Sequence, residues 1–197
     1  MGLRIADARD QRGYDTMRIF VAGLSKSGKS TRSHHAASER SDIDYVGVSK
    51  LLKATGGILP VQTIDDALAN QHKAVDALQA LPRQKPYQLI DGHALIETTQ
   101  GPFAVPDAFF DAIQPSLLIH VEDLPEDLYK RRFPLGMLAP PEELAALATM
   151  ERAVCERVAA RLHIPLVIMV SPTPGAFAQV LAQELEKLSA RSSAKDR

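Results

Sequence analysis

The sequence has no tryptophan, one cysteine, few aromatic residues and almost no net charge. Aromatic residues make up 5% of the 197 residues, and 23 Lys and Arg stand against 24 Asp and Glu. The single cysteine, Cys155, excludes an internal disulfide and is typical of a protein of the reducing cytosol. The balanced charge gives no indication of nucleic-acid binding. No apolar run is long enough to span a bilayer, and the charges between Arg4 and Arg12 interrupt the apolar segment that a signal peptide needs. We therefore expect a cytoplasmic protein with no membrane or nucleic-acid partner.

The sequence does contain enough apolar residues for one substantial core. Hydrophobic residues make up 45% of a chain whose length is typical of a single domain. Polar segments at the two ends predict a flexible N-terminal tail over residues 1–16 and a flexible C-terminal tail over residues 189–197, on either side of one domain over residues 17–188. Cys155 lies in a predicted helix, where a small buried side chain is a better interpretation than a nucleophile.

The most informative stretch is residues 23–30, GLSKSGKS, which fit the phosphate-binding pattern G-x-x-x-x-G-K-[ST] at every fixed position. Gly23 and Gly28 have no Cβ, so the loop can fold back and aim several backbone N–H groups at one phosphate. Lys29 is expected to contact the β- and γ-phosphates, and Ser30 to bind Mg²⁺. The residues expected to hold ATP are Gly23, Ser25, Lys26, Ser27, Gly28, Lys29, Ser30 and Thr31.

Strands alternate with helices along the chain. Strands are predicted over residues 17–22, 43–46, 87–90, 117–121 and 166–170. Helices are predicted after the phosphate loop and over residues 48–54, 65–80, 106–113, 125–132, 141–162 and 174–188, and a loop is predicted over residues 96–105. This alternation predicts a three-layer α/β fold with a central parallel sheet of five strands. Ligands of such sheets bind at the carboxyl ends of the strands.

Asp91 follows the strand over residues 87–90, so it shares the carboxyl edge of the sheet with the phosphate loop. A carboxylate at this place is a hard oxygen ligand for Mg²⁺, directly or through water. The alternative is a turn formed by Asp91 and Gly92. His93 is a candidate to hold a substrate phosphate or to orient a water, or else a solvated loop residue.

Three arginines are candidates to neutralise phosphate charge. Arg131 and Arg132 end a predicted helix, and Arg152 lies in the long helix that follows. A guanidinium stays charged and binds phosphate in a bidentate manner. The competing interpretations are a favourable interaction with the helix dipole for the pair and an exposed helix face for Arg152.

These motifs together resemble the phosphate-loop nucleoside-monophosphate kinases. The loop of residues 23–30, the Asp91-Gly92-His93 turn, the arginine pair and the final strand, loop and helix are most similar to archaeal-type adenylate kinases and to small bacterial ATP-binding proteins like them. The resemblance covers about residues 17–188 and implies the strand order 2-3-1-4-5. It also implies that Asn70 and Gln71 lie on the substrate side, and that residues 171–175 border the nucleotide base.

One segment departs from this family. Archaeal-type kinases carry further arginines in a lid after the helix arginines, whereas residues 133–140 of this chain, FPLGMLAP, have no charge. We expect this segment to be an apolar lid or a contact surface.

The sequence as a whole predicts a kinase that uses ATP and Mg²⁺. The expected reaction moves the γ-phosphoryl group to a small acceptor, for which a nucleoside monophosphate is one candidate. Lys29, Asp91, Arg131, Arg132 and Arg152 are the expected catalytic residues, Asn70, Gln71 and His93 the substrate-binding ones, and Ser30 and Asp91 the metal ligands. The alternatives are a nucleotide-dependent ATPase switch and a non-catalytic ATP-binding module. A monomer and a homodimer are both compatible with the sequence.

Overall fold

The computed structural model describes residues 16–195 and contains the predicted five-stranded parallel sheet. Its strands lie in the order β2-β3-β1-β6-β7, and every neighbouring pair is parallel. Their bounds are β1 Met17–Ala22, β2 Ile43–Gly47, β3 Tyr87–Asp91, β6 Leu117–Glu122 and β7 Leu166–Val170. Counted along the chain, this is the order 2-3-1-4-5 that the resemblance implied, so that prediction is confirmed.

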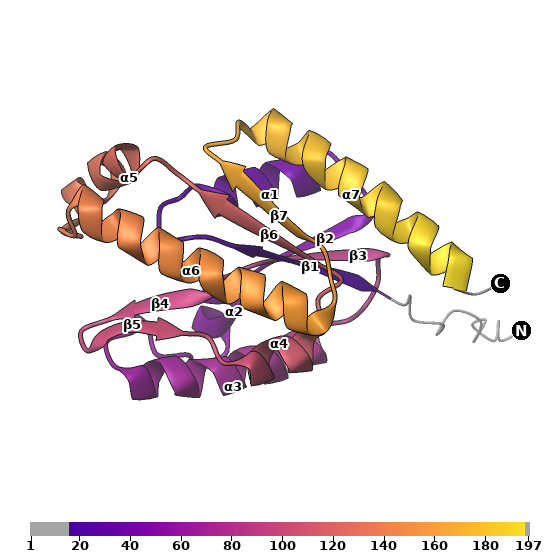
Figure 1. Ribbon diagram of the computed structural model, residues 1–197. Helices are drawn as coiled ribbons and strands as arrows, with labels where there is room; N and C mark the ends of the chain where they lie inside the picture. The colour runs from indigo at the N-terminus through magenta and orange to yellow at the C-terminus, as the bar shows by residue number, and fades with distance from the viewer. Residues whose placement is uncertain (1–15, 196–197) are drawn as a thin grey trace, which may run out of the picture.

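Helices cover both faces of the sheet and make three layers (Figure 1). Their bounds are α1 Lys29–Ser38, α2 Val48–Ala54, α3 Ile64–Ala80, α4 Asp107–Ile113, α5 Pro125–Arg132, α6 Pro141–Leu162 and α7 Pro174–Lys195. A short 3-10 turn, η1 Phe133–Leu135, follows α5. The α/β architecture predicted from the sequence is therefore confirmed.

Each face of the sheet has its own core because side chains of a strand alternate between the two faces. Ile19 and Val21 of β1 pack with Phe177 and Leu181 of α7, on the face that α1 and α7 cover. The intervening Phe20 packs on the other face with residues of α2, α3, α4 and α6. Cys155 of α6 lies in this second core at 1% exposure, and burial raises the pKa of its thiol, which supports the interpretation as a packing residue.

Two sequence predictions are wrong. The predicted loop of residues 96–105 contains an antiparallel hairpin, β4 Leu95–Thr98 and β5 Gly101–Ala104, which lies between α3 and α6 (Figure 1). The last helix, α7, continues to Lys195, beyond the end predicted at residue 188. The predicted N-terminal tail lies outside the described residues except for residue 16. Among residues 16–195, no helix combines the length and apolar character that a membrane span needs.

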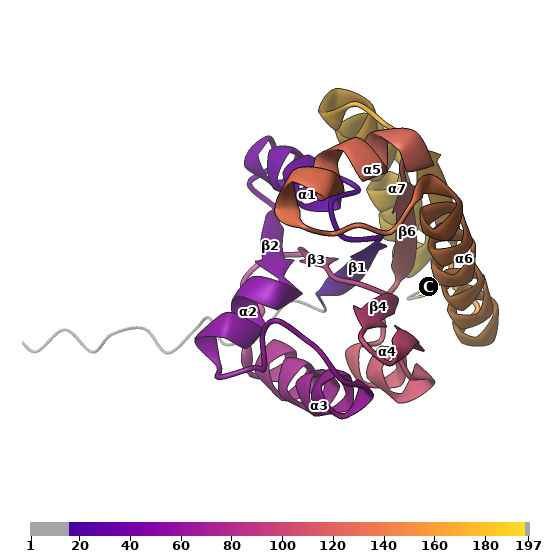
Figure 2. The ribbon, with the colours of Figure 1, turned by 90° about the vertical axis from the view of Figure 1, so that its left-hand side faces the viewer.

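The carboxyl ends of the strands lie at one edge of the sheet, and Figure 2 looks onto this edge. In that view α2 and α3 lie on one side of the sheet and α5 with its following loop on the other. A third cluster of buried residues joins the phosphate loop, the hairpin, α5 and α6, and consists of Leu24, Leu95, Leu128, Leu144 and Leu147. The predicted site residues therefore rest on packed elements.

Candidate active site

Two adjoining cavities open at the carboxyl edge of the sheet. The first, of about 550 Å³, lies over the phosphate loop and is called the phosphate cleft here. The second, of about 300 Å³, lies between β1, α2, α3 and the β4–β5 hairpin and is called the acceptor cavity. Four residues line both spaces: Ser25, Ser49, Gly92 and His93. The two cavities therefore share a wall.

Glycines allow the phosphate loop to adopt its conformation. A Cβ on Gly23 would lie 2.4 Å from the carbonyl oxygen of Val121, so the close approach of loop and strand requires glycine here. Gly28 has a φ of 80° at the N-terminal cap of α1, in the left-handed region that glycine tolerates. Arg32 braces the loop from α1, since its Nη1 donates to the carbonyl of Ser27 at 2.6 Å and its Nε donates to that of Pro172.

Most of the residues predicted to hold ATP face the phosphate cleft. Those that line it are Ser25, Lys26, Gly28, Lys29, Ser30 and Thr31. Gly23 and Ser27 do not line it. Gly23 packs against β6, and Ser27 is 1% exposed with a hydroxyl group that has no hydrogen-bond partner among the described residues. Their positions indicate that Gly23 and Ser27 support the conformation of the loop and do not line the cleft.

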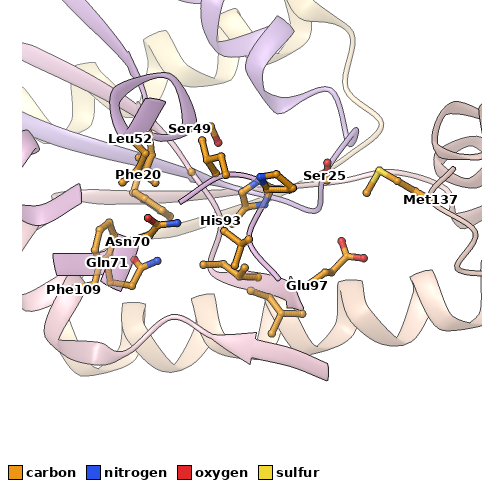
Figure 3. A pocket seen from close by; sticks show the side chains of 17 residues that line it. Phe20, Ser25, Ser49, Leu52, Asn70, Gln71, His93, Glu97, Phe109 and Met137 are labelled. Carbon is orange, nitrogen blue, oxygen red and sulfur yellow. The ribbon is translucent and has the colours of Figure 1, made fainter. Parts of the chain in front are cut away.

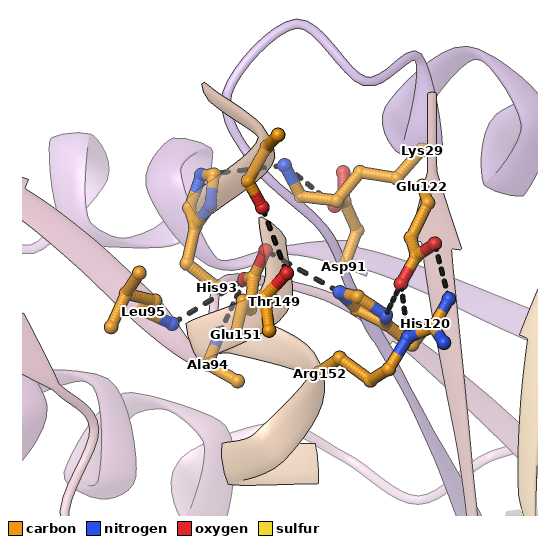
Figure 4. A network of polar contacts seen from close by, with 11 residues as sticks. Lys29, Asp91, His93, Ala94, Leu95, His120, Glu122, Thr149, Glu151 and Arg152 are labelled. Carbon is orange, nitrogen blue, oxygen red and sulfur yellow. Dashed lines mark hydrogen bonds and ion pairs between the residues drawn. The ribbon is translucent and has the colours of Figure 1, made fainter. Parts of the chain in front are cut away.

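Lys29, Asp91 and His93 meet at the floor of the cleft (Figure 4). The Nζ atom of Lys29 lies 3.3 Å from Nε2 of His93 and 4.0 Å from Oδ1 of Asp91. Burial lowers the pKa of Lys29, although the charge of Asp91 opposes the shift. Burial, followed by the charge of Lys29, lowers the pKa of His93 to about 4. His93 is therefore a neutral imidazole at pH 7.

Asp91 has the surroundings that a magnesium ligand requires. Its Oδ2 accepts a hydrogen bond from the hydroxyl of Tyr45 at 3.0 Å, while its buried Oδ1 has no hydrogen-bond partner among the described residues. Ser30 lines the same cleft. A buried carboxylate oxygen without a hydrogen-bond donor, in a cleft that Ser30 also lines, fits a Mg²⁺ bound with nucleotide phosphates, directly or through water.

The structure separates the three candidate arginines. Arg131 lines the phosphate cleft and forms an ion pair with Asp123. Arg132 is buried at 1% exposure and donates to Glu97 of β4 at 2.5 Å, outside the lining of the cleft. Arg152 makes two hydrogen bonds to Glu122, at 2.6 and 2.5 Å, and does not line the cleft either. Only Arg131 lies where phosphate recognition was expected.

A buried polar network supports the Asp91 turn from α6 and was missed by the sequence predictions (Figure 4). Glu151 is completely buried, and its Oε1 accepts from the backbone N–H of Ala94 at 2.9 Å and of Leu95 at 3.3 Å. Its Oε2 lies 3.6 Å from Nε2 of His120, whose Nδ1 lies 3.2 Å from Glu122. One sequence signal could have indicated this network, namely the histidine inside the apolar strand LLIHVE. A buried polar side chain needs hydrogen-bonding partners, so this histidine predicts other polar groups near it.

Asn70, Gln71 and His93, the predicted substrate residues, all line the acceptor cavity (Figure 3). The carboxamide of Asn70 is engaged with the backbone of Ile58, accepting from its N–H and donating to its carbonyl, both at 2.8 Å. Asn70 therefore fixes the loop that forms one wall. Gly92 belongs to the shared wall, where a Cβ would come within 2.8 Å of the ring of Phe20.

No family model matches the sequence, and the comparison with curated proteins gives no match. Solved structures, by contrast, show the same fold at low sequence identity. Shikimate kinase from Acinetobacter baumannii in complex with shikimate has a TM-score of 0.56 and 17% identity, over 90% of this chain and 95% of that one. Thymidylate kinase from Candida albicans has a TM-score of 0.54 and 16% identity, over 87% of this chain and 92% of that one. The chain thus has the same three-layer α/β fold as these two structures.

Proposed function

We propose that this chain is an ATP- and Mg²⁺-dependent phosphotransferase that moves the γ-phosphoryl group of ATP to a small acceptor. The observation that carries the proposal is the wall shared by the phosphate cleft and the acceptor cavity. Direct transfer requires the acceptor beside the terminal phosphate, and two adjoining cavities provide that arrangement.

The residues of the cleft would act by position and charge. Lys29 and the loop amides would hold the β- and γ-phosphates, while Ser30 and Asp91 would hold the Mg²⁺ that neutralises them. Arg131 lines the same cleft and would meet the charge that develops during transfer. Residues 171–175, which follow β7, would border the nucleotide base.

A second candidate, a nucleotide-dependent ATPase switch, is favoured by one observation. The segment 133–140 has no charge and exposes Phe133 at 54%, Leu135 at 56% and Leu138 at 65%, as a surface for another protein would. Met137 of the same segment nevertheless lines the acceptor cavity, which favours a lid over a purely external surface.

The deciding experiment measures ATP consumption by the purified chain with and without a panel of small acceptors, nucleoside monophosphates included. Formation of ADP that depends on an acceptor, together with a phosphorylated product, supports the phosphotransferase. Steady hydrolysis that no acceptor changes would support the switch. Binding of ATP without turnover would leave a binding module.

A further inference from the structure

The acceptor cavity has a charge balance that does not suit an anionic acceptor. Its lining residues include no lysine and no arginine, and Glu97 and His93 are its only ionisable side chains. The carboxylate of Glu97 is paired with the buried guanidinium of Arg132 at 2.5 Å, so the two charges balance. Nε2 of His93 faces the ammonium group of Lys29 at 3.3 Å, where the ring can only accept, so it offers no positive charge to the cavity. A dianionic phosphate placed in this cavity would find no cation there.

The cations of the site belong to the phosphate cleft instead. Lys26, Lys29, Lys50 and Arg131 line the cleft, and none of them lines the acceptor cavity. Arg131 is already paired with Asp123, and Asp91 faces the same space. The triphosphate of ATP would engage these cations, which leaves no cluster of positive charge for a second phosphate.

The remaining lining of the acceptor cavity is apolar with a few hydrogen-bonding groups (Figure 3). Its apolar surface comes from Phe20, Val48, Leu52, Leu59, Pro60, Val61, Leu95, Ile96, Phe109 and Met137. Glu97 offers acceptor oxygens, and the amide of Gln71 offers both a donor and an acceptor. A cavity of about 300 Å³ lies at the small end of ligand sites and suits a molecule no larger than a nucleoside.

We infer that the acceptor is an uncharged, ring-containing alcohol of nucleoside size whose N–H or O–H groups face Glu97 and Gln71, and that it is not a monophosphate. This inference rests on the proposed phosphotransferase function. It names the class of acceptor that the cavity selects.

Transfer to an alcohol differs from transfer to a phosphate because the attacking oxygen must lose a proton. The hydroxyl oxygen forms a bond to the γ-phosphorus, the bond from that phosphorus to the β,γ-bridging oxygen breaks, and ADP leaves with the electron pair. The hydroxyl proton passes to a non-bridging oxygen of the transferred phosphoryl group and then to solvent. His93 lies on the wall shared by the two cavities and, through its contact with Lys29, would hold this lysine beside the transferred group.

The test measures binding and turnover with matched pairs of ligands. Nucleosides and their 5′-monophosphates are titrated into the full chain saturated with Mg²⁺ and a non-hydrolysable ATP analogue, so that free phosphates cannot occupy the phosphate loop. At least one nucleoside should bind roughly tenfold or more tightly than its monophosphate, because the monophosphate would bring an unpaired charge into the cavity. With ATP, the same nucleoside should yield ADP and a phosphorylated product.

Variants distinguish recognition by the cavity from binding elsewhere. Gln71→Leu should raise the KM of the alcohol by roughly tenfold and leave ATP affinity unchanged. Gln71→Arg should allow the monophosphate to bind, whereas Gln79→Arg on the same helix but outside the cavity should not. Lys50→Gln should change ATP affinity alone, since Lys50 lines only the phosphate cleft. His93→Asn should lower kcat for the alcohol, because the imidazole that holds Lys29 at the shared wall is lost.

The inference is overturned if a monophosphate binds more tightly than its nucleoside, or if no uncharged member of the panel binds. It is also overturned if Lys50→Gln raises the KM of an acceptor, because Lys50 would then hold an acceptor phosphate. Phosphorylation of monophosphates alone would overturn the inference and leave the proposed function intact. Loss of the proposed function would instead appear as ATP binding or hydrolysis that no acceptor changes.

Discussion

The Nζ atom of Lys29 lies 3.3 Å from Nε2 of His93, which connects the first residue of α1 to the turn after β3. An ammonium group can only donate, so Nε2 of His93 must accept and the ring carries its proton on Nδ1. The imidazole also makes a hydrogen bond to the backbone of Gly23. One neutral ring therefore holds the lysine of the phosphate loop over the wall shared by the two cavities.

Lys29→Ala should reduce ATP affinity or turnover by roughly 10²-fold or more, because the only buried cation of the cleft is removed from the β- and γ-phosphates. ATP binding measured by calorimetry and folding measured by circular dichroism check this result. Lys53→Ala, on the exposed face of α2, is the matched control and should behave like the parent protein. Unchanged affinity and turnover in a folded Lys29→Ala protein would contradict the assignment of the phosphate loop.

Asp91→Asn should lower Mg²⁺-dependent turnover sharply, by about 10²-fold, while nucleotide binding without metal is kept or improved. The change preserves the shape of the side chain and the hydrogen bond from Tyr45, but it removes the charge on Oδ1, which accepts no hydrogen bond. The measurement is turnover as a function of Mg²⁺ concentration, with Asp65→Asn on α3 as an exposed control. Normal turnover at saturating Mg²⁺ would mean that Asp91 only forms the turn.

The arginine variants should separate into two classes. Arg131→Ala should lose far more turnover than ATP affinity, because Arg131 is the candidate arginine that lines the phosphate cleft. Arg132→Ala should instead lower the free energy of unfolding by about 2–3 kcal/mol, because it removes the buried partner of Glu97. The loss is limited because Glu97 is itself partly exposed. Arg152→Ala breaks a partly buried pair with Glu122 at the surface end of the arginine and should change stability by about 1 kcal/mol. Turnover, ATP affinity and urea denaturation are measured for each variant.

If none of the three variants loses turnover relative to ATP affinity, the phosphotransferase is contradicted and the switch or the binding module takes its place. Loss of turnover in Arg152→Ala alone would point to a movement that brings α6 to the phosphates, because Arg152 does not line the cleft in this structure.

Glu151→Ala should destabilise the protein by roughly 2–4 kcal/mol, because it leaves the buried N–H groups of Ala94 and Leu95 without their acceptor. It should also lower turnover, since these residues follow directly on the Asp91-Gly92-His93 turn. Glu151→Gln keeps an oxygen at the Oε1 position and should recover most of the stability. Urea denaturation checks the first effect, and similar losses in the two variants would contradict a role for the backbone contacts.

The sequence was sufficient to predict the sheet and the phosphate cleft because both depend on local patterns. Apolar strands such as residues 17–22 and 87–90 are recognisable on their own, and the glycines and Lys29 of the loop have fixed spacing. The pairing of Arg132 with Glu97 could not be predicted, since it depends on how α5 and β4 approach in space. The hairpin was missed because Gly101 and Pro102 suggest a loop. Packing between α3 and α6 nevertheless holds β4 and β5 together as an antiparallel strand pair.

The helical end of α7 shows a related limit of sequence reasoning. A polar composition over residues 189–195 predicts a solvated tail, but a helix that is already anchored by buried residues continues at little cost. Phe177, Leu181 and Leu185 are fully buried and fix the first turns of α7, so the polar residues that follow extend an existing helix.

His93 should make the stability of the protein depend on pH between about 4 and 6.5. Burial and the charge of Lys29 lower the pKa of His93 from 6.5 to about 4 in the folded protein. Below pH 6.5 His93 binds a proton in the unfolded chain but stays unprotonated in the folded protein. The free energy of unfolding therefore falls as the pH falls through this window. The loss attributable to His93 should reach on the order of 3 kcal/mol near pH 4.

The measurement is the free energy of unfolding by urea at pH 7.0, 6.0, 5.0 and 4.5 for the parent protein and for His93→Gln. A glutamine can still accept from Lys29 but does not titrate, so the variant should lose less stability as the pH falls. Titrating groups distant from the ring contribute to both proteins and cancel in the difference. His72→Gln, on an exposed face of α3, should retain the full pH dependence of the parent. Parallel curves for the parent and His93→Gln would show that His93 is solvated and that its position on the shared wall has no electrostatic consequence.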